Sequence, residues 1–148
     1  MAELTITSPA FKHEKPIPAK YSCQGEDINP PLNINGIPEE AKTLVLIMDD
    51  PDAPMGTFDH WVMWNIPPVS EISEDTVPEE AEQGKNSWDK NEYGGPCPPS
   101  GTHRYYFKLY ALDTSLDLPA SSGKKDVESA MSGHVLAETV LMGTYEKS

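Results

Sequence analysis

Residues 43–48 have the sequence TLVLIM, a short continuous apolar segment that is typical of a strand covered on both faces. Residues 60–66 (HWVMWNI) and residues 103–112 (HRYYFKLYAL) are likewise apolar and aromatic, and the second is the longest strand candidate in the chain. Residues 136–145 predict a closing strand. Clusters of Asn, Asp, Gly and Pro separate these segments and indicate turns between them. The pattern predicts a protein built mainly from strands.

The proline content supports this interpretation. Fifteen of the 148 residues are proline, about twice ordinary usage, and proline breaks helix interiors and central strands alike. One short helix is predicted over residues 125–131, ending before Gly133. We find no internal repeat and no linker. We therefore expect a single domain over residues 1–148: a mainly β protein with two antiparallel sheets packed as a β-sandwich and one short helix near the C-terminus.

The charge and the distribution of apolar residues exclude several classes of partner and location. Acidic residues outnumber basic ones 24 to 11, which gives a formal net charge of −13, so a nucleic-acid backbone is not an expected partner. The longest apolar run, residues 44–48, is far shorter than the roughly 20 residues of a membrane-spanning helix. No basic segment followed by an apolar one marks a signal peptide, so we expect no integral membrane association and a cytoplasmic protein.

Two further features concern the connections. Residues 71–82 carry six carboxylates and no basic residue, so we expect an exposed, mobile connection, with an acidic docking site as the alternative. Cys23 and Cys97 are the only cysteines, too few for a disulfide framework. Two buried free thiols are the favoured interpretation, and a bridge remains possible if the fold brings their loops together.

Two of the four histidines share a context. His60 and His103 each begin a predicted strand and, by strand alternation, share a face with its apolar residues. Each also follows a rigid proline-rich loop, residues 49–54 and 94–101 respectively. We therefore expect both imidazoles at the rim of the core, where a ligand could reach them. Arg104, the only arginine, lies on the opposite face, so we expect it to clamp a carboxylate of the acidic loop.

Several residues have a simpler explanation. Asp52 is as well explained by capping backbone N–H groups in its proline-rich turn as by ligand binding. The aromatic residues near both histidines are expected in the core. His13 is expected in solvent, and His134, after the predicted helix end, is expected to be structural.

Two segments are similar to the signature of the phosphatidylethanolamine-binding protein family. They are residues 50–54 (DPDAP) followed by His60-Trp61, and residues 95–105 (GPCPPSGTHRY). The match resembles the small bacterial and archaeal branch and extends over most of the chain. The resemblance implies a β-sandwich whose pocket binds phosphate or a phospholipid headgroup. By motif position, the pocket would be lined by Asp50, Asp52, His60, Pro99 and His103, with Arg104, Gly95 and Trp61 in supporting positions.

The predicted chemistry fits that implication. Two imidazoles can donate hydrogen bonds to an oxyanion, and a nearby Asp50 could fix a ring tautomer or meet a cationic group. We expect a small anionic or zwitterionic ligand, such as phosphate or phosphoethanolamine, with no cofactor, metal or catalytic residue. The resemblance also implies a possible kinase or serine protease target, and a homodimer is possible.

The alternative is a hydrolase. Asp50, Asp52, His60 and His103 could together hold a metal ion, or Cys97 could act as a nucleophile with His103 as its base.

Overall fold

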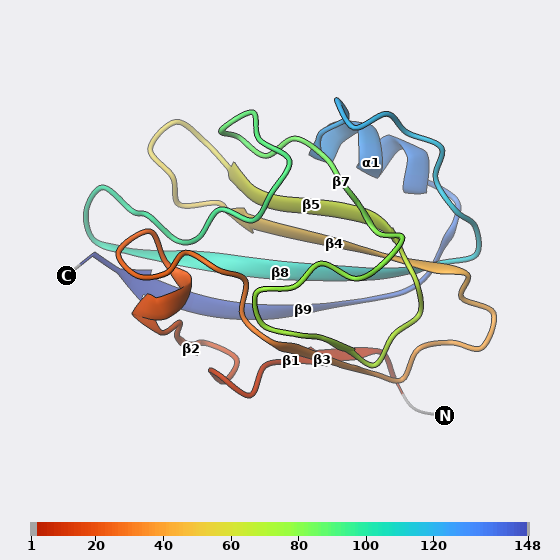
Figure 1. The fold of residues 1–148 in the computed structure, drawn as a ribbon, viewed down its shortest axis with the longest axis horizontal. Helices are drawn as coiled ribbons and strands as arrows, with labels where there is room; N and C mark the ends of the chain where they lie inside the picture. The colour runs from red at the N-terminus through yellow and green to blue at the C-terminus, as the bar shows by residue number, and fades with distance from the viewer. Residues whose placement is uncertain (1–2, 148) are drawn as a thin grey trace.

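The computed structural model describes residues 3–147 and shows two packed β-sheets with one α-helix (Figure 1). The larger sheet has six strands in the order β2-β9-β8-β4-β5-β7, and the smaller has three in the order β1-β3-β6. In chain order the elements are β1 (Thr5–Thr7), β2 (Lys15–Pro16), the 3-10 helix η1 (Ala19–Tyr21), β3 (Leu32–Asn35), β4 (Thr43–Asp50), β5 (Phe58–Ile66), β6 (Glu71–Ile72), β7 (Glu82–Gln83), β8 (Thr102–Leu112), α1 (Lys124–Met131) and β9 (Val135–Glu146). The mainly β fold class and the helix near the C-terminus are confirmed.

Strand β4 lies at the centre of the larger sheet, antiparallel to both β5 and β8. Strand β9 is antiparallel to β8 along eleven residue pairs, from Thr102↔Glu146 to Leu112↔Val135. The sheet is not wholly antiparallel, because β2 pairs in parallel with β9. Strand β2 is a two-residue edge strand that contains Pro16. It is too short to show the alternation of apolar residues from which a strand can be predicted.

The core explains why β4 is apolar throughout. All eight of its residues are buried. Leu44, Leu46 and Met48 pack in the cluster that joins the two sheets, whereas Val45 and Ile47 face the cluster that includes α1. The prediction of a strand covered on both faces is therefore confirmed.

The acidic stretch, residues 71–82, is mostly exposed, as predicted, but it is anchored at a few points. Its first two residues form β6, in which Ile72 is buried, and Glu82 begins β7. Between them Glu74 accepts hydrogen bonds from Tyr21 Oη and from Lys20 Nζ, at 2.5 and 2.9 Å. The prediction of an exposed connection is therefore confirmed for most of these residues, and Ile72 and Glu74 are the points that hold the stretch to the rest of the fold. Its mobility stays a prediction.

The cysteines form a disulfide, so the favoured prediction of two buried free thiols is wrong. The bond joins Cys23, after η1, to Cys97, in the loop before β8, with their Cα atoms 5.4 Å apart. Both residues are exposed. The two loops are also held by a backbone hydrogen bond from Cys23 N to Pro96 O at 3.1 Å. The disulfide spans 74 residues of sequence.

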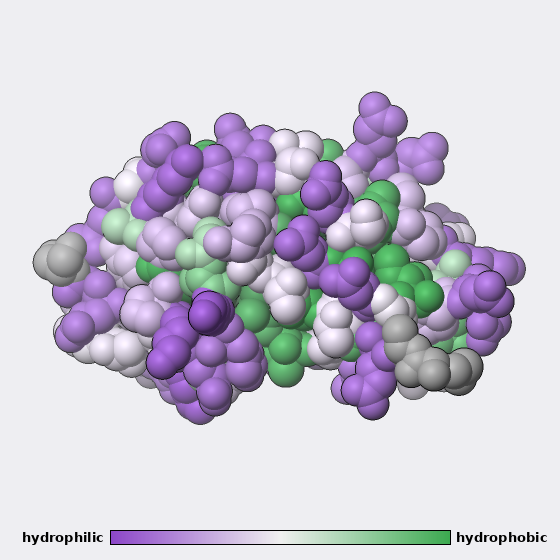
Figure 2. Space-filling model, turned by 90° about the horizontal axis from the view of Figure 1, so that it is seen from below, coloured by the Kyte–Doolittle hydropathy of each residue, from purple (hydrophilic) through white to green (hydrophobic). Residues whose placement is uncertain are grey.

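The surface reflects the composition. Hydrophilic residues cover most of the face seen in Figure 2, with apolar residues showing between them in the middle. Among the described residues, no helix is long and apolar enough to cross a membrane.

Candidate ligand-binding site

A pocket of about 470 Å³ opens at one end of the larger sheet. Figure 1 shows that the loop between β4 and β5 and the loop before β8 meet at this end. Residues 53–58 and 97–99 form its rim, and the buried side chains of Asp50, His60 and His103 also line it. Its volume is in the range of small-molecule sites. The predicted meeting of two histidines at the rim of the core is confirmed.

Asp50 and His103 form a buried hydrogen-bonded pair at this pocket. His103 Nδ1 lies 2.7 Å from Asp50 Oδ2, and the two residues are 8% and 3% exposed. The second carboxylate oxygen, Oδ1, accepts a hydrogen bond from the backbone N–H of Asp52 at 2.8 Å. Both oxygens of Asp50 are therefore engaged. With Nδ1 donating to Asp50, the imidazole keeps Nε2 for a second partner.

His60 is held in a different environment. It is 3% exposed, and its Nδ1 lies 2.8 Å from the carbonyl oxygen of Gly94. Burial lowers the pKa of the His60 imidazole, although the hydrogen bond to Gly94 and the charge of Asp50 oppose this shift. A neutral ring that donates from Nδ1 has a hydrogen-bond acceptor at Nε2. The environment of His60 therefore favours the neutral ring.

Aromatic side chains form the walls of the pocket. The rings of Phe58 and Trp88 lie 4.6 Å apart, and His60 lies 5.0 Å from Trp88 and 5.2 Å from Tyr105. Sequence reasoning missed Trp88, which lies in an irregular segment without strand or helix periodicity. Its 41% exposure is unusual for tryptophan. A tryptophan among polar residues, NSWDKNEY at 86–93, was the available signal.

Asp52 does not line this pocket. It faces Arg104, whose Nε and Nη2 donate to its two carboxylate oxygens at 2.9 and 2.8 Å, while the Arg104 backbone N–H donates to Oδ2 at 2.9 Å. The hydrogen bond from Arg104 lowers the pKa of the Asp52 carboxyl to about 2. The predicted clamp between Arg104 and the acidic loop is confirmed. Asp52 serves that clamp, whereas Pro99 lies at the pocket rim.

The other two supporting residues position the surrounding elements. Trp61 is fully buried in the core between the two sheets, and its Nε1 donates to Gln83 Oε1 at 2.8 Å. Gly95 donates its backbone N–H to Asp27 Oδ1 at 2.7 Å. A Cβ atom at Gly95 would lie 2.1 Å from the backbone oxygen of Tyr21. Only glycine therefore lets this loop lie so close to the segment after η1.

This arrangement occurs in a known family. The sequence profile described as phosphatidylethanolamine-binding protein matches residues 7–146. The chain belongs to the phosphatidylethanolamine-binding protein family. A UPF0098 protein of Pyrococcus horikoshii is 51% identical over 150 residues, covering 95% of this chain and 75% of that protein. A UPF0098 protein of Aquifex aeolicus is 46% identical, covering 99% and 90%.

Solved structures agree with the family assignment. A phosphatidylethanolamine-binding protein homologue from Chlamydia trachomatis superposes with a TM-score of 0.96 at 45% identity, covering all of both chains. YbcL of E. coli, described as a member of the mammalian phosphatidylethanolamine-binding protein family, gives 0.92 at 29% identity and covers 99% of this chain and 100% of its own. The fold neighbours thus extend the family match to almost every described residue.

The donor geometry bears on the hydrolase alternative. Within residues 3–147, no group of three or more His, Cys, Asp or Glu side chains is placed to hold a metal ion. Asp52 is turned to Arg104, and His60 to a backbone carbonyl. Cys97 is bonded to Cys23, so in this form it has no thiolate to act as a nucleophile.

Proposed function

We propose that this member of the phosphatidylethanolamine-binding protein family binds a small phosphate-bearing ligand in the pocket at the ends of β4, β5 and β8. The observation that carries the proposal is the pair of buried imidazoles, His60 and His103, held by fixed partners beside aromatic walls. Polar groups at fixed positions within mainly apolar walls are typical of small-molecule sites.

The two rings offer complementary hydrogen bonds to such a ligand. His103 uses Nδ1 for Asp50, so Nε2 is the atom that would donate to an oxyanion when the ring carries both protons. A neutral His60 accepts from a protonated oxygen of the same group. One donor and one acceptor in the same pocket match a phosphate monoester that keeps one proton, the form that dominates below its second pKa of about 6.

The walls favour a cationic group at the other end of the ligand. Asp50 is already occupied by His103 and by a backbone N–H, so it is not the natural partner for an ammonium. The rings of Phe58 and Trp88 at the pocket mouth can contact an ammonium through cation–π attraction. Phosphoethanolamine, anionic at one end and cationic at the other, therefore fits better than inorganic phosphate.

Isothermal titration with O-phosphoethanolamine, inorganic phosphate and ethanolamine tests this proposal. We expect the zwitterion to bind most tightly and His103→Gln to weaken it about tenfold or more, because a charge-assisted hydrogen bond is lost. His134→Gln is the matched control, since His134 is exposed and contacts Asp113 elsewhere. Equal affinity in both variants and the wild type, or no binding by the wild type, would overturn the proposal.

Inhibition of a kinase or serine protease, self-association as a dimer and a cytoplasmic location stay predictions. The pocket would be the natural place to regulate such a partner, because its rim loops are exposed. Adding O-phosphoethanolamine to a partner-binding assay would reveal that regulation.

A further inference from the structure

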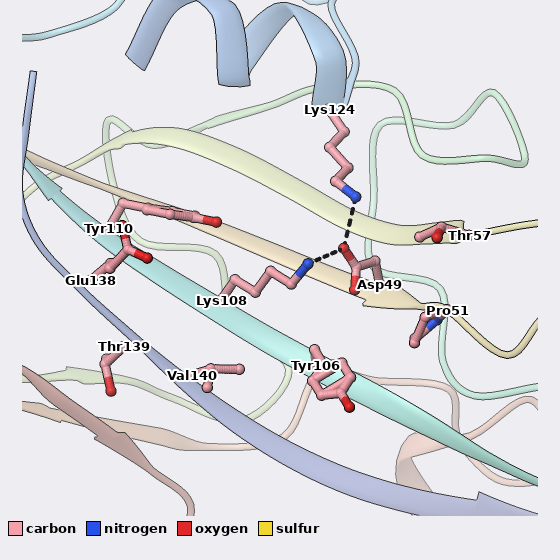
Figure 3. A pocket seen from close by; sticks show the side chains of 10 residues that line it. All are labelled: Asp49, Pro51, Thr57, Tyr106, Lys108, Tyr110, Lys124, Glu138, Thr139 and Val140. Atoms are coloured by element: carbon pink, nitrogen blue, oxygen red, sulfur yellow. Dashed lines mark hydrogen bonds and ion pairs between the residues drawn. The ribbon is translucent and has the colours of Figure 1, made fainter. Parts of the chain in front are cut away.

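A second cavity, of about 650 Å³, lies on the other face of the larger sheet. Asp49 and Asp50 are successive residues of β4, so their side chains point to opposite faces. Asp50 reaches the histidine pocket, whereas Asp49 reaches this second cavity. Figure 3 shows Tyr106, Lys108 and Tyr110 following one another along β8, and Lys124 reaching down from the start of α1.

Two ammonium groups meet on one buried carboxylate oxygen here. Lys108 Nζ and Lys124 Nζ each lie 2.9 Å from Asp49 Oδ2 (Figure 3), and the Asp49 side chain is 1% exposed. The two nitrogens are therefore at most about 6 Å apart. Asp49 Oδ1 has no hydrogen-bond partner within residues 3–147.

The two lysines have hydrogen-bonding capacity left for a ligand. Each ammonium carries three N–H donors, and Asp49 takes one from each. Burial alone would lower the pKa of the Lys124 ammonium, but its hydrogen bond to Asp49 and the charges of Asp49 and Asp59 together raise it. Asp59 Oδ1 is 3.9 Å from Lys124 Nζ. Lys124 is thus held in its cationic form, although the chain as a whole is strongly acidic.

Two tyrosines and a valine give this otherwise mainly polar cavity an apolar surface beside the lysines. Tyr106 and Tyr110 flank Lys108 on the same face of β8, and Val140, which is 44% exposed, lies opposite Lys108 in the register with β9. Glu138 lies opposite Tyr110 and lines the far end. An anionic group is therefore favoured at the lysines and disfavoured at the Glu138 end.

We propose that this cavity binds an organic anion with an aromatic or other flat apolar body, whose carboxylate or phosphate group bridges Lys108 and Lys124. The body would lie between Tyr106, Tyr110 and Val140, with any hydrogen-bond donor at its far end facing Glu138. The proposal does not depend on the histidine pocket. The two cavities share only Thr57 among their lining residues.

Nuclear magnetic resonance with phenyl phosphate as the probe tests this site separately from the first. We expect saturable shifts of the Tyr106 and Tyr110 ring signals. A parallel titration with inorganic phosphate, which lacks the aromatic body, should give weaker binding at the same signals. Shifts confined to His60 and His103, or none that saturate at Tyr106 and Tyr110, would overturn the proposal.

Three variants complete the test. Lys108→Gln should weaken phenyl phosphate binding at the tyrosine signals about tenfold or more. Val140→Glu should weaken phenyl phosphate binding to a similar extent, because it places a carboxylate beside Lys108. It leaves both lysines and Asp49 unchanged, so it tests the site even if the lysine variant folds poorly. Lys125→Gln removes an exposed charge next to Lys124 and should bind as the wild type. Unchanged affinity in the first two variants, or equal weakening in the third, would contradict a site at the lysine pair.

Discussion

Replacing both cysteines, Cys23→Ser with Cys97→Ser, should destabilise the fold strongly while leaving it folded at room temperature. The disulfide closes a loop across 74 residues of sequence. In the chain-entropy account, a loop of this length is worth about 4.5 kcal/mol, and measured values are typically about 2–4 kcal/mol. The loops keep other contacts, including the Gly95 N–H to Asp27 hydrogen bond at 2.7 Å. We therefore expect a loss of about 3–4 kcal/mol and a melting temperature roughly 10 °C lower.

Differential scanning calorimetry with and without a phosphine reductant measures this effect. The oxidised wild type should melt well above the reduced wild type, because both cysteines are exposed and accessible to the reductant. The double variant should match the reduced protein and ignore the reductant. Equal melting temperatures for oxidised wild type and double variant, or two titratable thiols in the unreduced folded protein, would refute the reasoning.

Three further perturbations probe the surroundings of the histidine pocket. Arg104→Gln removes the partner that lowers the pKa of the Asp52 carboxyl from 3.8 to about 2. Because the carboxyl has its lower pKa in the folded state, the ion pair stabilises the protein above about pH 4 and loses this effect as the pH falls through about 2. The urea midpoints of variant and wild type should therefore differ at pH 7 and converge near pH 2. A difference that is constant with pH would contradict the assignment. Gly95→Ala places a Cβ 2.1 Å from the Tyr21 carbonyl oxygen and should lower the free energy of unfolding by about 1–3 kcal/mol. An unchanged free energy of unfolding in urea titration would mean that the loop can shift to accommodate the added Cβ. Trp88→Ala should weaken O-phosphoethanolamine binding about threefold to tenfold, as measured by calorimetry. Its urea midpoint should be nearly unchanged, since the side chain is 41% exposed. Unchanged affinity would remove Trp88 from the site.

The four long strands could be predicted because their signal is local. Residues 43–48 are apolar at every position, and β4 is buried on both faces. Alternation correctly placed His103 on the face of Tyr105, which packs in the core between the sheets. It was wrong for His60, because it placed this residue with Val62 and Trp64 on the α1 side. A β-bulge at His60, where Met48 pairs with Trp61 and Asp49 with Asp59, turns the ring to the pocket instead. The same alternation placed Arg104 on the other face, where it clamps Asp52. Each of the correct conclusions needed only neighbours along one strand.

The features that sequence reasoning missed depend on distant parts of the chain. Whether Cys23 meets Cys97 is decided by how η1 packs against the loop before β8, which no local pattern encodes. Trp88 reaches the pocket from an irregular segment, and β2 pairs with β9 across more than 120 residues. The Asp49 cluster needs both β8 and the start of α1. Spacing along the chain is uninformative for such contacts.

Side-chain NMR of the histidines, across a pH titration with and without O-phosphoethanolamine, tests the central claim most directly. Binding should move the His60 and His103 signals together and raise the pKa of both rings, because a bound anion favours the charged imidazole. His13 and His134, which lie outside the pocket, should not respond. The His60→Ala/His103→Ala variant should lose the binding isotherm. If neither pocket ring responds, or if all four respond alike, the pocket does not bind this ligand and the account is contradicted.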